Sequence, residues 1–98
     1  MNLIKESNGS ALTIKVEGRL DTITAPKLEA ELKSSISGVT TLTFDFSNLE
    51  YISSAGLRVL LSAQKVMKKQ GKMVVRNVND TIMEVFEVTG FSDFLTIE

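Results

Sequence analysis

The chain reads DFSNLEYISSAGLRVLL over residues 45–61. Its first two residues end a longer run, residues 39–46, in which branched and aromatic residues alternate with polar ones as in a half-buried strand. Four small residues follow at positions 53–56, and the apolar residues beyond them keep helical spacing up to Lys69. The stretch therefore predicts a strand that passes through a turn at residues 47–49 into a long helix.

The segment before this junction predicts a hairpin and a helix. Residues 3–6 and 11–17 flank an Asn-Gly pair, and the second run alternates strictly between apolar and polar side chains. A helix is expected over residues 25–36, where leucines recur at helical spacing. Thr24 can cap this helix, and Pro26 is tolerated in the first turn because its missing N–H has no intrahelical partner there.

The segment after the junction continues the alternation of helices and strands. Residues 72–77 predict a strand, a third helix is expected to be capped by Asp80 and to end at Gly90, and residues 94–97 predict a last strand. Two opening strands followed by this alternation predict an α/β fold, with a mixed sheet of about four or five strands and about three or four helices.

Length and composition limit the function. Ninety-eight residues without linker, repeat or low-complexity segment predict one domain over residues 1–98. The chain has neither Cys nor His, so we expect no metal site, no cofactor and no enzymatic activity. A net charge of -1 gives no electrostatic basis for nucleic-acid binding, and no segment resembles a signal peptide or a membrane span. We expect a cytoplasmic protein that binds another protein or a small ligand.

The start of the second helix is the least generic part of the chain. A helix N-terminus has four unpaired N–H donors and about half a positive charge, so it favours an anion or an added phosphate at Ser53 or Ser54. A plainer hypothesis is that one serine caps the helix and Gly56 allows close packing. The helix also has more apolar residues than one stripe needs, so part of it is either uncovered or buried between the sheet and a neighbouring helix. The residue types leave both questions open.

Three stretches resemble the STAS domains, and among these the stand-alone bacterial anti-sigma factor antagonists. They are residues 16–21 with the helix start at 24–25, residues 42–57, and residues 71–75 with 85–91. The resemblance covers essentially the whole chain, and its middle stretch is the most specific. It implies a STAS-type fold.

The resemblance also implies a partner-switching regulator. Such proteins bind an anti-sigma factor that is also a serine protein kinase, and this releases a sigma factor. The kinase phosphorylates a serine at the start of the second helix, and a PP2C-type phosphatase restores it. Aligned on Gly56 and Leu57, the acceptor position falls on Ser54. The family pattern has an Asp where this chain has Ser53 and a second hydroxyl where it has Ala55, so Ser53 is an alternative acceptor.

The partner-binding surface that the resemblance implies surrounds this serine. Asp21 matches an acidic family residue where partner contact is expected, although a role in the turn before the first helix explains it equally well. The expected contact residues are Asp21, Thr22, Ser53, Ser54, Gly56, Leu57, Arg58 and Leu61.

Two other functions compete with this interpretation. A STAS docking module that is never phosphorylated, for example in a lipid-transport complex, would use the same helix start as a constitutive contact. Ser53 and Ala55 fit this alternative as well. A nucleotide-binding protein or hydrolase is disfavoured, because the chain has neither a GxxxxGK[ST] phosphate loop nor a His.

Overall fold

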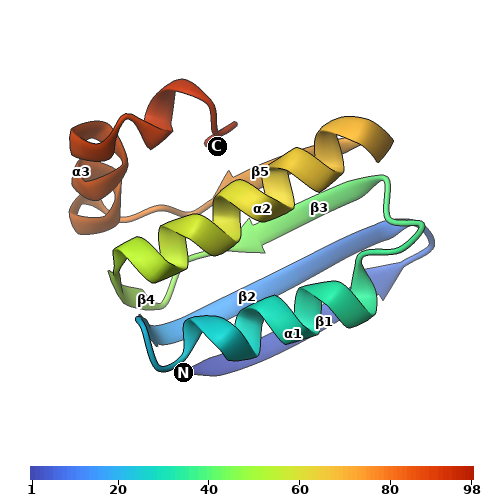
Figure 1. Ribbon diagram of the computed structural model, residues 1–98, viewed down its shortest axis with the longest axis horizontal. Helices are drawn as coiled ribbons and strands as arrows, with labels where there is room; N and C mark the ends of the chain where they lie inside the picture. Colours follow the sequence, from blue (N-terminus) through green and yellow to red (C-terminus); the bar gives the residue numbers. More distant parts are fainter.

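A computed structural model describes residues 1–98 and shows a five-stranded mixed sheet with three α-helices (Figure 1). Four strands form the order β1-β2-β3-β5, and the short β4 pairs with β2 beyond the end of β3. This confirms the predicted fold class. The strands are β1 (Asn2–Asn8), β2 (Ala11–Leu20), β3 (Thr41–Asp45), β4 (Leu49–Ile52) and β5 (Lys72–Arg76). The helices are α1 (Ala25–Ser35), α2 (Ser54–Gln70) and α3 (Asp80–Thr89), followed by a 3-10 turn, Phe91–Asp93.

The register of the sheet follows from its connections. β1 and β2 form the predicted antiparallel hairpin, with Leu3 opposite Val16. β2, β3 and β5 are parallel because helices cross over between them, and Phe44 lies between Ile14 and Val75 in the centre of the sheet. Since paired residues point to the same face, these three side chains make a continuous apolar layer.

The core lies between that layer and the two long helices. Figure 1 shows α1 and α2 side by side across one face of the sheet, and α3 at its end beside β4. Leu28 of α1 and Leu60 of α2 are fully buried against the sheet. Val59 and Ala63 are buried as well, so most of the apolar excess of α2 is covered by the sheet and its neighbouring helix. Val66 remains 40% exposed. None of the helices has the length and apolar composition that crossing a bilayer requires.

β4 was not predicted: it begins at the last residue of the predicted turn, Leu49, and runs through residues 50–52, which were expected only to lead into the helix. Its outer residues, Leu49 and Ile52, are buried, whereas the two between them are exposed. This pattern lacks the period of two that identifies a strand, and β4 forms only because the end of β2 offers it a parallel partner.

The C-terminal part differs from the prediction at two points. Asn79, not Asp80, caps α3: its side-chain oxygen accepts from the N–H of Ile82 at 2.9 Å, and Asp80 is the first helical residue. The last strand is reduced to a single bridge between Val75 and Ile97. The N–H groups of Phe94 and Leu95 donate to the carbonyl of Phe91 in the turn instead of pairing with β5.

Candidate functional site

The parallel pairing of β2 and β4 brings two parts of the chain together. Arg19 lies opposite Tyr51 and Leu20 opposite Ile52, so both strands end at the same edge. The N–H of Ser53 then donates to the carbonyl oxygen of Leu20 at 2.9 Å. The turn between β2 and α1, residues 21–24, therefore lies beside the start of α2, where loops that follow parallel strands commonly form binding sites.

The two serines at the start of α2 have different surroundings. Ser53 is the N-cap residue with an extended backbone, but its hydroxyl makes no capping bond. The oxygen of that hydroxyl is buried and has no hydrogen-bond partner. Ser54 is the first residue of the helix and is exposed. Of the two, Ser54 presents itself to a protein that approaches from outside.

Gly56 allows α2 to approach the ends of the strands closely. A Cβ atom at this position would lie 2.8 Å from Cγ of Leu20 and 2.9 Å from Cγ1 of Ile52. The close-packing hypothesis for Gly56 is therefore confirmed. Leu57 is a core residue that is only 6% exposed.

Fewer of the expected contact residues are exposed around Ser54 than the sequence predicts. Gly56 and Leu57 support it from inside, because the turn of α2 that carries them faces the sheet. Leu61 is half-buried, whereas Arg58 is exposed. Thr22 and Arg58 line opposite sides of an open hollow of about 420 Å³ between α1 and α2.

Asp21 organises the turn before α1. Its Oδ1 accepts from the backbone N–H groups of Ile23 at 3.0 Å and Thr24 at 3.1 Å. Oγ1 of Thr24 accepts from the N–H of Asp21 and donates to the carbonyl of Arg19. Asp21 thus has the turn role that the sequence left open, and Thr24 binds the turn rather than capping α1 with its side chain.

The same bonds lower the pKa of Asp21. The N–H of Thr24 contributes most to lowering the pKa of Asp21 below its ordinary value of 3.8. Together with the N–H of Ile23, it outweighs the opposing effect of desolvation on that pKa. Asp21 therefore places a negative charge at the edge where β2 ends.

Sequence analysis missed three exposed side chains at this edge. Ile23, at the tip of the turn, is 82% exposed. Tyr51 is 41% exposed, and the guanidinium carbon of Arg19 lies 4.2 Å from the centre of its ring, within cation–π range. The one sequence signal was for Ile23, which is an isolated apolar residue within the polar sequence DTIT.

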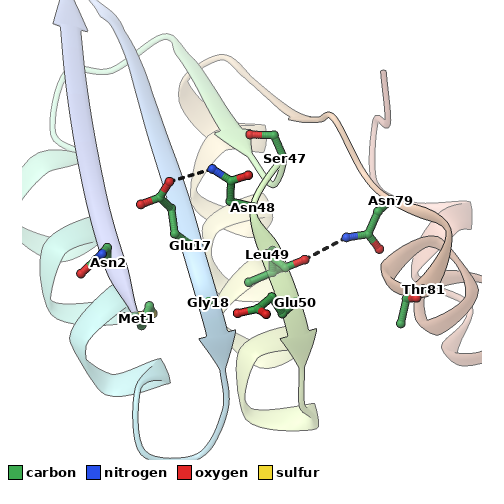
Figure 2. Close-up of a pocket in the computed structure, with 10 residues that line it drawn as sticks. All are labelled: Met1, Asn2, Glu17, Gly18, Ser47, Asn48, Leu49, Glu50, Asn79 and Thr81. Atoms are coloured by element: carbon green, nitrogen blue, oxygen red, sulfur yellow. Dashed lines mark hydrogen bonds between the residues drawn. The ribbon is translucent and has the colours of Figure 1, made fainter.

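A polar hollow of about 720 Å³ lies where β2, β4 and the start of α3 meet (Figure 2). The amide of Asn79 donates to the carbonyl of Leu49 at 2.8 Å, while its oxygen caps α3. Asn48 donates to Glu17 at 2.8 Å across the same hollow. These bonds hold β4 in place from two sides, and β4 in turn positions Ser53 and Ser54.

The fold and this edge define a small regulatory binding domain, in which an exposed hydroxyl at a helix start lies beside a fixed turn. The model of the STAS domain family matches residues 2–98, and the chain belongs to this family. Members of this kind act by binding and are not enzymes, which confirms the non-enzymatic prediction.

Curated relatives carry the same functional name. The chain is 37% identical over 93 residues to the "Putative anti-sigma factor antagonist BtrV" of Bordetella bronchiseptica, covering 93% of this chain and 80% of the relative. It is 32% identical over 97 residues to the "Anti-sigma-B factor antagonist" of Listeria monocytogenes, covering 97% and 85%.

Solved structures share the fold. The anti-sigma factor antagonist SpoIIAA in its unphosphorylated form matches with a TM-score of 0.86 at 21% identity, covering 99% of this chain and 88% of that one. The Bacillus protein SpoIIAA in its phosphorylated form matches with a TM-score of 0.78 at 21% identity, covering 99% and 91%.

Proposed function

We propose that this chain is an anti-sigma factor antagonist that, when unphosphorylated, binds an anti-sigma factor and so releases a sigma factor in the cytoplasm. The observation that carries this proposal is the whole-chain relationship to curated antagonists, joined to an exposed Ser54 beside the turn that Asp21 organises. Both features lie at the edge where β2 and β4 end.

Phosphorylation of Ser54 is the switch in this proposal. Ser54 is exposed, whereas the hydroxyl oxygen of Ser53 is buried, which supports Ser54 as the acceptor. A phosphate adds about -1.5 to -2 charges, and a helix start tolerates such an anion, so the fold should survive.

Binding is expected to respond much more strongly than folding. In a docked complex the partner would cover both the phosphate and the ionised Asp21, and like-charge and desolvation penalties are about 2–5 kcal/mol at an interface. At about 1.4 kcal/mol per tenfold, affinity falls roughly 30- to several-thousand-fold. The kinase in this scheme is the anti-sigma factor itself, and a PP2C-type phosphatase restores the hydroxyl.

A second candidate is a STAS docking module that is never phosphorylated. This chain has Ser53 and Ala55 where the family pattern has an acid and a second hydroxyl. The absence of those two family side chains beside the acceptor weakens the case for recognition by a kinase and so favours the constitutive module.

Mass spectrometry after incubation with ATP and a candidate anti-sigma factor kinase from the same genome separates the two candidates. The proposal expects one added phosphoryl group, mapped to Ser54 and absent from Ser54→Ala but retained in Ser53→Ala. No added mass with a kinase that binds the chain would favour the constitutive module, and a phosphate on Ser53 would refute the assignment of the acceptor.

A further inference from the structure

Ile23 is the most exposed large apolar side chain in the structure. It is 82% exposed at the tip of the turn between β2 and α1, whereas other isoleucines, including Ile14 and Ile52, are in the core. A large apolar side chain in this position contributes little to the stability of the fold. Its exposure leaves it free to contact another molecule.

The turn holds the backbone of Ile23 in one position. Its own N–H and that of Thr24 both donate to the carboxylate of Asp21, and Thr24 also binds the carbonyl of Arg19. The N–H of Ala25 donates to the carbonyl of Asp21 at 2.8 Å, which joins the turn directly to α1. A backbone that is already fixed loses little conformational freedom when a partner covers the side chain it carries.

Two exposed side chains near the ends of β2 and β4 are of the types that dominate binding energy at interfaces. Arg19 and Tyr51 are exposed, contact each other and lie opposite one another on β2 and β4. Tyr and Arg are enriched among the few interface residues that contribute most of the affinity. The bond between Ser53 and Leu20 brings Ser54 to the same edge.

We propose that Ile23 is the apolar anchor of this docking surface and enters an apolar pocket of the protein that binds the unphosphorylated chain. The inference rests on the proposed function and adds a specificity-determining residue to it. Continuity with the Ser54 edge argues for the partner rather than a second copy of this chain as the occupant. The depth of that pocket would then select the side chain at position 23, independently of the charge at position 54.

Calorimetry with the full chain and the anti-sigma factor from the same genome that binds it tests this inference. Ile23→Ala should weaken binding about 10- to 100-fold, and Ile23→Val should restore most of the affinity. Val88→Ala is the matched control, because Val88 is 80% exposed on α3, and it should bind like the unaltered chain. Circular dichroism should show all three variants folded, since neither side chain is in the core.

Three outcomes would overturn the inference in distinguishable ways. Equal affinity of Ile23→Ala and the unaltered chain would remove Ile23 from the interface while leaving the proposed function intact. Failure of the unaltered chain to bind would refute the proposed function and the inference with it. A dimer of the unaltered chain that Ile23→Ala converts to monomer, as seen by light scattering, would make a second copy the occupant.

Discussion

The N–H of Ser53 donates to the carbonyl of Leu20 at 2.9 Å, which fastens the start of α2 to the end of β2. Through this bond a position in the middle of the sequence shares one edge with the turn at residues 21–24. A modification of Ser54 therefore alters the surface that Asp21 and Ile23 also form.

Gly56→Ala should destabilise the fold. The new methyl group would overlap Leu20 and Ile52, and overpacking of this kind costs about 1–3 kcal/mol, only partly offset by the higher helix propensity of Ala. The measurement is urea unfolding. Ser62→Ala, on an exposed position of the same helix, is the control and should leave the free energy of unfolding unchanged or slightly higher. A Gly56→Ala variant as stable as the unaltered chain would contradict the close packing seen here.

Asp21 should make the free energy of unfolding depend on pH in the acidic range. Because its pKa is lowered in the folded state, its contribution is present above the ordinary value of 3.8 and is lost as pH falls through the lower folded value. NMR titration should place the carboxyl midpoint of Asp21 below 3.8. Asp21→Asn keeps an acceptor oxygen for the turn but does not titrate, so its stability should change less over the same pH range. An unchanged pH dependence would mean that the turn does not hold the carboxylate.

Ser53→Asp should stabilise α2 and improve recognition by the kinase. The backbone of Ser53 already has the extended conformation of an N-cap, yet its hydroxyl caps nothing. A carboxylate able to accept from the first turn should add about 0.5–1 kcal/mol. Ser53→Asn separates capping from charge: it should stabilise the fold similarly without accelerating phosphorylation. Thermal unfolding and phosphorylation rates measure the two effects, and a lower melting temperature for Ser53→Asp would show that the buried position has no room for a carboxylate.

Asn79 should matter for both α3 and β4. Asn79→Ala removes the cap of α3 and the donor to Leu49 together, and we expect a loss of about 1–3 kcal/mol in unfolding experiments. Asn79→Asp keeps the capping acceptor but loses the donor, so its stability should fall between those of the unaltered chain and Asn79→Ala. If Asn79→Asp were as unstable as Asn79→Ala, the bond to β4 would account for the whole effect.

The long periodic elements could be predicted from the sequence because their faces repeat over many residues. The periodic patterns correctly predicted the positions of the hairpin, α1, β3, α2, β5 and α3. β4 could not, since Leu49 and Ile52 have no alternating pattern and depend on a partner strand distant in sequence. Asn79 and Asp80 are both good capping residues, and only the path of the chain decides between them.

The candidate site was predicted unevenly for the same reason. Ser54 and Arg58 are exposed as a docking surface requires, whereas Leu57 looked available because periodicity does not say which side of α2 the sheet covers. Ile23 and Tyr51 went unnoticed because their exposure depends on the turn geometry and on the pairing of β2 with β4.

The switch at Ser54 is best tested by the affinity of the chain for an anti-sigma factor from the same genome, measured before and after phosphorylation of Ser54. We predict tight binding of the unphosphorylated chain and a loss of roughly 30-fold or more on phosphorylation, with the fold unchanged by circular dichroism. Equal affinity of the two forms would contradict the switch at Ser54.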